Sequence, residues 1–182
     1  MKIAIIGTGK MARGFAAALA PKHEVTLGSR DADRAGAAAS ATGASRGATY
    51  ADAAADAKVV ILTVPWHAVE ETLRQLGDLN GTVVVDVCHP YKKSEREALR
   101  GSSTAEEIQK RLPRARVFKG WNHVHARDLT SPEVEGIAAS VLIAGDDPNA
   151  KKVVFGLARD MGFDPVDVGA LKATRDLEDW LA

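Results

Sequence analysis

The sequence of 182 residues has a single cysteine, Cys88, and no excess of charge of either sign. One thiol can form neither an internal disulfide nor a metal site of several thiolates, which is typical of the reducing cytoplasm. The 24 Lys and Arg residues balance 24 Asp and Glu residues, whereas proteins that bind nucleic acid or anionic membranes usually carry a basic excess. We therefore expect a cytoplasmic protein with neither nucleic acid nor membrane as a partner.

Long hydrophobic runs are also missing. No apolar run approaches the roughly 20 residues that a helix needs to cross a bilayer, and glycine interrupts the first apolar stretch too early for a signal peptide. With 46% hydrophobic and 26% charged residues, the composition is that of one globular domain, which we place at residues 1–182.

Short runs rich in Val and Ile alternate along the chain with segments of helical spacing. These runs are almost continuously apolar, which is typical of strands buried on both faces of a sheet. Strands are predicted at 3–6, 24–27, 59–64, 83–87, 116–118, 141–143 and 163–169. Helices are predicted at 11–20, 31–41, 67–76, 104–112 and 149–161, with a short closing helix after the last strand. The alternation predicts a single α/β domain of the doubly wound Rossmann type, with a mostly parallel sheet.

The segment Gly7-Thr8-Gly9-Lys10-Met11-Ala12 lies where the first strand passes into the first helix. A dinucleotide-binding turn needs glycine at the bend, glycine where the backbone approaches the pyrophosphate, and a small residue where helix meets strand. Gly7, Gly9 and Ala12 meet these needs, and the N–H groups that begin the helix would face the phosphates. The segment predicts a nucleotide-binding site; the alternative is a glycine turn without a ligand.

The second predicted strand ends in the sequence Gly28-Ser29-Arg30. A site that prefers NAD usually has Asp or Glu about 20 residues beyond the glycine turn, where the carboxylate binds the ribose 2′-hydroxyl. Here the first carboxylate, Asp31, follows the arginine. The hydroxyl of Ser29 and the guanidinium of Arg30 suit the 2′-phosphate of NADP, and Arg34 extends the same patch. The alternative is a solvated Arg30 that pairs with Asp31 or Asp33.

The segment Thr63-Val64-Pro65-Trp66 follows the apolar run of the third predicted strand. Ligands of doubly wound sheets bind outside the carboxyl ends of the strands, so we expect this segment to border the dinucleotide. Pro65 stiffens the turn because its φ is fixed. Trp66 is expected to pack against a ring or ribose, or else against the protein's own core.

Histidines occur near several predicted strand ends, at His67, His89, His123 and His125. His123 and His125 have a spacing found among metal ligands, but no third ligand stands at a suitable spacing, so no metal site is expected. Hydride transfer between a nicotinamide and an aromatic acceptor needs few side chains, because the protein only holds two rings together. Gly120 would let the backbone approach a flat ring, and Asn122 and His123 are the candidate active-site residues that would hydrogen-bond it.

Three functions fit these residues. The first is an NADPH-dependent reductase that passes a hydride to an aromatic acceptor ring. The second is a reductase of a small carbonyl or imine substrate, with His123 or His125 as proton donor. The third is an NADP-binding sensor without turnover. Few residues follow the last predicted strand, so we expect a small-molecule acceptor to bind against the nucleotide domain itself or between the subunits of a homodimer.

The chain resembles the NADPH-dependent reductases of the deazaflavin coenzyme F420 over nearly its whole length. The resemblance rests on Gly7-Thr8-Gly9-Lys10-Met11, Gly28-Ser29-Arg30, Leu62-Thr63-Val64-Pro65-Trp66, Ser103-Thr104-Ala105-Glu106-Glu107-Ile108, Lys119-Gly120-Trp121-Asn122, Ala144-Gly145-Asp146-Asp147 and Val166-Asp167-Val168-Gly169-Ala170-Leu171. It implies a Rossmann core, NADP held at the first turn and at Ser29-Arg30, and reversible hydride transfer to a deazaflavin beside the nicotinamide. The ferric-reductase domains of membrane metalloreductases, which use a flavin, look similar too. The segment 86–91 differs from the family, where a more apolar loop lines the acceptor cleft.

Overall fold

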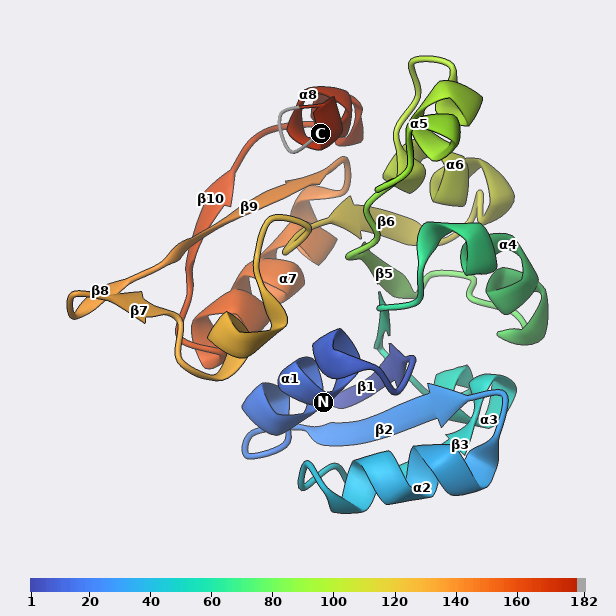
Figure 1. The fold of residues 1–182 in the computed structure, drawn as a ribbon, viewed down its shortest axis with the longest axis vertical. Helices are drawn as coiled ribbons and strands as arrows, with labels where there is room; N and C mark the ends of the chain where they lie inside the picture. Colours follow the sequence, from blue (N-terminus) through green and yellow to red (C-terminus); the bar gives the residue numbers. More distant parts are fainter. Residues whose placement is uncertain (180–182) are drawn as a thin grey trace.

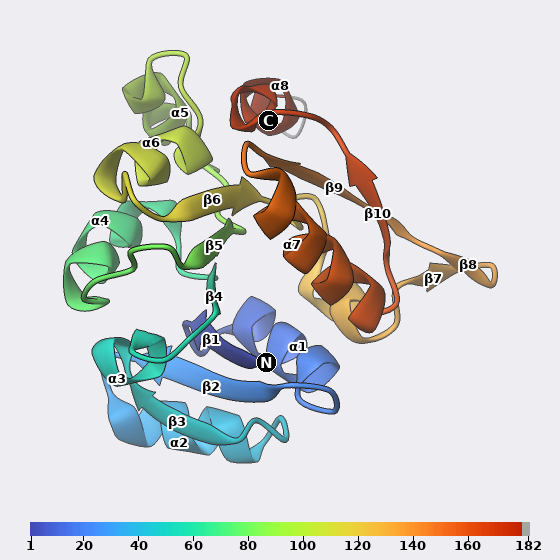
Figure 2. The same cartoon turned by 180° about the vertical axis from the view of Figure 1, so that it is seen from behind.

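The computed structural model describes residues 1–179, which form an eight-stranded sheet between two layers of helices (Figures 1 and 2). The strands are β1 (Lys2–Ile6), β2 (Glu24–Ser29), β3 (Arg46–Thr49), β4 (Val59–Leu62), β5 (Val83–Asp86), β6 (Arg116–Lys119), β9 (Ser140–Gly145) and β10 (Asp164–Asp167). Their spatial order is β10-β9-β6-β5-β4-β1-β2-β3, and all neighbours are parallel except β6 and β9. The predicted doubly wound, mostly parallel fold is confirmed.

Helices α1 (Lys10–Leu19), α2 (Ala32–Ser40) and α7 (Pro148–Asp160) cover one face of the sheet. Helices α3 (Tyr50–Ala54), α4 (Trp66–Gln75) and α6 (Thr104–Arg111) cover the other face. The remaining elements are α5 (Lys93–Leu99), the 3₁₀ turns η1 (Ala126–Thr130) and η2 (Leu171–Ala173), the hairpin strands β7 (Glu133–Val134) and β8 (Ile137–Ala138), and α8 (Thr174–Asp179). The hairpin projects from the body of the domain (Figure 1). None of the helices within residues 1–179 has both the length and the apolar character needed to cross a membrane.

The two helix layers explain why the central strands are apolar at every position. In β1, Ile3 and Ile5 belong to the core beneath α1, α2 and α7, whereas Ala4 and Ile6 belong to the core beneath α3, α4 and α6. Successive side chains of a strand point to opposite faces, so a strand with a helix layer on each side buries all of them. The uninterrupted apolar run is therefore a direct consequence of the double layer.

Some elements were not predicted. Strand β3 has the sequence Arg46-Gly47-Ala48-Thr49, in which one side chain is buried, so it carries no apolar pattern. Gly47 is needed there because a Cβ would lie 2.2 Å from the backbone of Ala35 and Gly36 in α2. Helix α5 and the β7–β8 hairpin are mostly exposed and were missed for the same reason. The predicted closing helix is α8, and residues 180–182 lie outside the described part of the chain.

Candidate active site

The carboxyl ends of the central strands form one continuous row. The first residue after each strand donates its backbone N–H to the last or nearly last carbonyl of the neighbouring strand. The bonds are Gly7 N to Gly28 O (2.9 Å), Thr63 N to Ile6 O (3.1 Å), Val87 N to Leu62 O (3.3 Å) and Gly120 N to Asp86 O (3.2 Å). The sheet therefore brings the loops after β1, β4, β5 and β6 to one edge. They lie on both sides of the point between β1 and β4 where the strand order reverses.

The glycine turn at the start of this row has the shape of a pyrophosphate cradle. Gly7 has φ +133°, which favours glycine, and a Cβ there would lie 2.6 Å from Thr63 Oγ1. A Cβ on Gly9 would meet no atom within 4 Å, so the backbone is open at this point. Gly9 begins α1 without a side-chain cap, and the first turn of α1 contains no acidic residue. The free N–H groups of the helix end fit a bound pyrophosphate.

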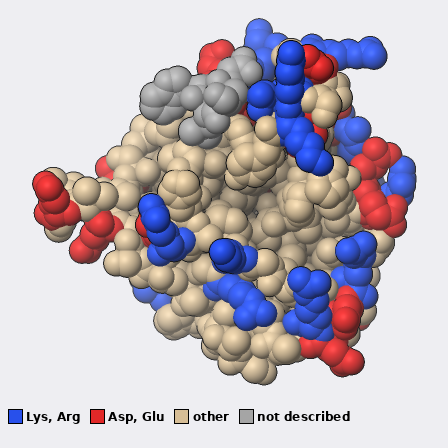
Figure 3. Space-filling view, in the orientation of Figure 1, with Lys and Arg blue, Asp and Glu red and all other residues tan. Residues whose placement is uncertain are grey.

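A cavity of about 520 Å³ lies beside this turn. Many of the residues that the sequence predicts to bind the cofactor line this cavity. They are Gly7, Thr8, Gly9, Lys10, Met11, Ser29, Arg30, Arg34, Thr63, Val64 and Pro65. The face shown in Figure 3 is hollowed near its centre, and Lys and Arg side chains lie below the hollow, over α1 and the end of β2. Three separate segments of the sequence thus meet around one cavity with a basic rim.

The end of β2 supplies the positive charge of the cavity. Arg30 and Arg34 both line it, and within residues 1–179 neither forms an ion pair. Asp31 is occupied elsewhere, because its carboxylate caps α2 by accepting from Asp33 N at 3.0 Å and Arg34 N at 3.2 Å. Within residues 1–179, Arg30 is exposed and forms no ion pair with Asp31 or Asp33.

Four cavity residues were not predicted: Tyr50, Ala68, Glu71 and Thr72. Tyr50 follows β3 and was missed because that strand was missed. Ala68, Glu71 and Thr72 lie on one face of α4, and their i, i+3, i+4 spacing is the signal that could have found them. Trp66 is not among the wall residues, because its side chain packs against the core on the α3, α4 and α6 face.

The loops after β5 and β6 lie farther along the row and do not line this cavity. Ala12 of α1 is fully buried in the core between this helix and the sheet. Gly120 is buried at the end of β6, where an added Cβ would make only ordinary contacts, at 3.6 Å or more. The structure thus separates the predicted residues into a cavity group and a group of loop residues formed by Gly120, Asn122 and His123.

These loops contain unsatisfied polar groups. Among the described residues, the buried side-chain atoms without a hydrogen-bond partner are His89 Nδ1, Trp121 Nε1 and both amide atoms of Asn122. All belong to residues directly after β5 and β6. A buried polar atom without a partner costs about 1–3 kcal/mol, so the concentration of four at two neighbouring strand ends makes these loops a candidate ligand-binding region.

Burial shifts the pKa values of three titratable groups in these loops, His89, His123 and Cys88. Burial, followed by the positive charges of Lys119 and Arg96, lowers the pKa of His89. Burial also lowers the pKa of His123. Burial, reinforced by the carboxylate of Asp86, raises the pKa of the Cys88 thiol well above its usual value, so the thiolate form is disfavoured at pH 7. Within residues 1–179 no group of His, Cys, Asp and Glu side chains is arranged to hold a metal ion.

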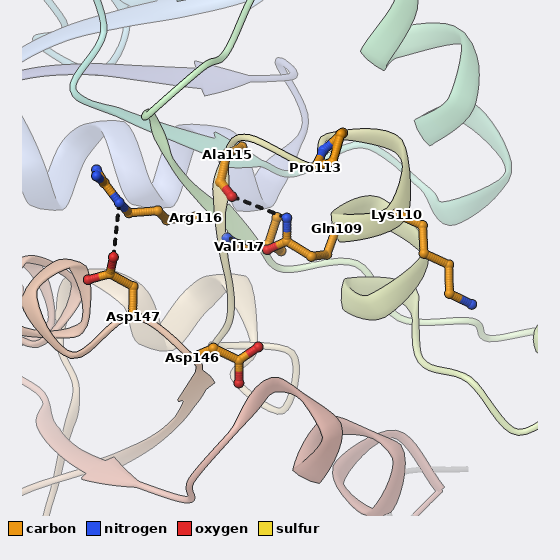
Figure 4. Close-up of a pocket in the computed structure, with 8 residues that line it drawn as sticks. All are labelled: Gln109, Lys110, Pro113, Ala115, Arg116, Val117, Asp146 and Asp147. Carbon is orange, nitrogen blue, oxygen red and sulfur yellow. Dashed lines mark hydrogen bonds and ion pairs between the residues drawn. The ribbon is translucent and has the colours of Figure 1, made fainter.

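A second cavity, of about 410 Å³, lies near the opposite end of β6 (Figure 4). Two of its polar side chains are already paired: Arg116 binds Asp147 at 3.0 Å, and the amide of Gln109 donates to Ala115 O at 3.1 Å. This cavity lies away from the carboxyl ends of β1, β4 and β5 and from the glycine turn. We therefore assign the site to the row of strand ends.

The cavity beside the glycine turn lies at the reversal point of a doubly wound sheet, where such folds bind dinucleotides, so the fold and this cavity define a dinucleotide-binding domain. The family model described as "NADP oxidoreductase coenzyme F420-dependent" matches residues 2–90. The F420-dependent NADP reductase of Methanocaldococcus jannaschii is 32% identical, over 98% of this chain and 88% of that protein. The crystal structure of a provisionally assigned F420-dependent NADP reductase from Arthrobacter sp. FB24 superposes with a TM-score of 0.89 at 30% identity, over 100% of this chain and 90% of the other.

Rat metalloreductase STEAP3 is also 32% identical over 97% of this chain, but the chain spans only 36% of that longer protein. The match over nearly whole lengths is with the F420-dependent reductases. The chain belongs to the family of F420-dependent NADP reductases and is an NADP-dependent oxidoreductase.

Proposed function

We propose that the chain transfers a hydride between NADPH and the deazaflavin ring of coenzyme F420, or a flavin-like ring in its place. The relatives that match over nearly their whole length carry F420 and NADP in their names. The observation that carries the proposal is the row of strand ends, because it places the cavity beside the glycine turn next to two loops with unsatisfied polar atoms.

In this proposal the adenosine half of NADPH lies in the cavity beside β2. The pyrophosphate would accept from the N–H groups that begin α1, and Thr8, Lys10 and Met11 would border it. Ser29, Arg30 and Arg34 would bind the 2′-phosphate. Arg30 and Arg34 form no ion pair within residues 1–179, and the Asp31 carboxylate is occupied as the cap of α2. Both features favour NADP over NAD.

The nicotinamide would lie at the end of β4, against Thr63, Val64 and Pro65. When bound, NADPH supplies the hydride from its dihydronicotinamide ring, and one proton from solvent balances the two-electron reduction of the acceptor. The protein's part is to hold the two rings face to face and to keep them in one orientation. Gly120 would allow the acceptor ring to lie close to the backbone.

Asn122 and His123 would orient the acceptor. The amide of Asn122 offers a donor group and an acceptor atom that have no partner among residues 1–179, which matches the carbonyl and N–H edge of a deazaflavin or flavin. His123 is neutral at pH 7 because burial lowers its pKa, so it would bind as a hydrogen-bond partner and not as a stored proton. A carbonyl or imine reductase with His123 as the proton donor is less consistent with this environment.

The test has two steps. Calorimetry with NADPH and NADH measures binding, and stopped-flow loss of NADPH absorbance is then followed with F420, FMN, FAD, a ferric chelate and a small imine. We expect NADPH binding and fast oxidation by F420. If only a flavin or a ferric chelate oxidises NADPH, that compound would replace F420 as the acceptor in the proposal. NADPH binding without oxidation by any compound would instead identify a sensor.

We further propose a homodimer that works in the cytoplasm. The β7–β8 hairpin exposes Val134 and Ile137, which are 68% and 72% exposed and would be covered in an association of two copies. A single cysteine suits a reducing compartment. Sedimentation velocity of the protein and of its Ile137→Glu variant tests the dimer, since the variant should sediment more slowly only if the hairpin lies in the interface.

A further inference from the structure

A polar cluster is buried directly beneath the loops after β5 and β6. It consists of Asp86 at the end of β5, Lys119 at the end of β6, Thr104 at the start of α6 and Glu178 in α8, and we call it the Lys119 cluster. Lys119 Nζ lies 2.9 Å from Asp86 Oδ2, 2.6 Å from Thr104 Oγ1 and 2.7 Å from Glu178 Oε1. The side chains of Lys119 and Asp86 are fully buried.

The charge of Lys119 is retained in this position. Burial alone favours the neutral amine, but the carboxylates of Asp86 and Glu178 outweigh it and raise the pKa of Lys119. A buried ion pair is rarely more stable than well-packed apolar side chains of the same volume, because both charges lose their hydration. General stability therefore does not explain why four polar side chains occupy this position; the backbone segment that they hold does.

The segment is Cys88-His89, which follows β5. Cys88 N donates to Asp86 Oδ1 at 2.8 Å, and Cys88 O accepts from Lys119 Nζ at 2.5 Å. The Lys119 cluster thus satisfies both backbone polar groups of a residue that lies beyond the strand ladder. The thiol of Cys88 donates to Val64 O at 3.1 Å, and Val64 lines the dinucleotide cavity. A continuous chain of contacts runs from Glu178 in α8 through Lys119 and Cys88 to the cavity wall.

We propose that Lys119 is a positioning residue, which fixes the Cys88-His89 segment as the acceptor side of the site, and that Glu178 of α8 completes the positioning. This rests on the proposed function only in placing the acceptor at the ends of β5 and β6. His89 is 5% exposed and its Nδ1 has no partner, so a rigid Cys88 sets where an unsatisfied buried nitrogen stands. The last helix thereby influences acceptor binding without touching the acceptor.

Helix α8 also contacts α6 through a residue outside the Lys119 cluster, and this contact provides a matched control. Arg175 makes two hydrogen bonds to Glu106, at 2.8 Å and 2.7 Å. Arg175→Ala removes this docking contact and leaves the Lys119 cluster intact. Glu178→Gln keeps the volume of the side chain but removes the charge beside Lys119, and its amide N–H₂ would face the Thr104 N–H that the carboxylate accepts at 3.1 Å.

The experiment compares the whole chain with Glu178→Gln, Arg175→Ala and Asp86→Asn. Because Cys88 is the only cysteine and is buried, the rate of its reaction with a thiol reagent, followed over a series of pH values to separate a changed thiol pKa from changed access, reports on the Cys88 segment. The other readouts are the dissociation constant of NADPH and the KM and kcat for the acceptor. For Glu178→Gln and Asp86→Asn we expect about tenfold faster thiol reaction and an acceptor KM raised about tenfold, with NADPH affinity unchanged.

Arg175→Ala should leave the thiol rate and the acceptor KM near those of the unaltered chain, even where its melting temperature falls. If Arg175→Ala and Glu178→Gln change both readouts equally, the cluster only docks α8 and the inference is overturned. Unchanged thiol rates in both cluster variants overturn it as well. Absence of NADPH binding by the unaltered chain would refute the proposed function instead, while the thiol rates would still test whether the cluster holds Cys88.

Discussion

Thr63 occupies the space that a side chain on Gly7 would need. Thr63 Oγ1 donates to Ile6 O at 2.8 Å, so the hydroxyl is fixed, and a Cβ on Gly7 would lie 2.6 Å from it. This contact joins the ends of β1 and β4, the two strands between which the sheet reverses its order. The bend that would receive the pyrophosphate and the segment that would receive the nicotinamide are therefore in direct contact.

Replacing each of the two glycines of the turn by alanine should have different effects on stability. Gly7→Ala should lower the free energy of unfolding by about 1–3 kcal/mol, because φ +133° is strained for alanine and the methyl group meets Thr63. Gly9→Ala should leave stability nearly unchanged, since φ is −75° and its Cβ meets no protein atom. NADPH binding should nevertheless weaken in Gly9→Ala, because the methyl group fills the space proposed for the pyrophosphate. Urea unfolding and calorimetry measure the two effects.

If Gly9→Ala bound NADPH as tightly as the unaltered chain, the pyrophosphate could not lie against the start of α1. A large loss of stability in the same variant would show that the open space at Gly9 is filled in solution.

Arg30→Ala should weaken NADPH binding by about 1–3 kcal/mol and leave NADH binding nearly unchanged, because only NADPH carries the 2′-phosphate. Arg114→Ala is the matched control. It removes an exposed arginine of the loop before β6 that is paired with Asp78 at 3.9 Å, and neither of these residues lines the cavity. Calorimetry with both dinucleotides measures the effect. Equal losses for NADPH and NADH would show that Arg30 does not bind the 2′-phosphate.

The sequence predicted those parts of the site whose residues are consecutive. The turn from Gly7 to Ala12 and the pair Ser29-Arg30 each carry their chemistry in one short segment, so spacing alone was informative. The Lys119 cluster draws Asp86, Thr104, Lys119 and Glu178 from four elements. No local pattern distinguishes such residues from solvated charges, because their neighbours become known only when the strands and helices pack.

The fold was predicted where both faces of a strand are buried, as in β1, β4 and β5, since apolar residues at every position leave a clear signal. Strand β3 was missed because it lies at the edge of the sheet and buries one side chain, Ala48. Tyr50, which follows β3 and lines the cavity, was therefore missed as well. Errors at the edge of the sheet thus became errors in the description of the site.

Stability should fall as the pH drops below about 6.5, the ordinary pKa of histidine. Burial and the charges of Lys119 and Arg96 lower the pKa of folded His89, with Asp86 and Glu95 acting in the opposite direction. The unfolded chain therefore takes up the proton first, and stability is lost from about pH 6.5 down to the lowered folded pKa. Above that range His89 is neutral in both states and contributes nothing.

Urea unfolding of the unaltered chain and of His89→Gln, at several values from pH 8 to pH 5, tests this. The variant should lose less stability than the unaltered chain between pH 7 and pH 5, and the two curves should run parallel between pH 7 and pH 8. Parallel curves over the whole range would mean that His89 is not shielded from solvent in the folded protein.

Lys119→Met should lower the free energy of unfolding by about 3–5 kcal/mol, because it leaves two carboxylates, Asp86 and Glu178, buried without their cation. Adding Glu178→Gln to Lys119→Met should then recover part of the loss, although Glu178→Gln alone is destabilising. This opposite sign in the two backgrounds is the signature of a coupled charge cluster, and a double-mutant cycle by urea unfolding measures it. Additive losses would show that Lys119 and Glu178 do not interact in solution, and that Cys88 O is held by Lys119 without help from α8.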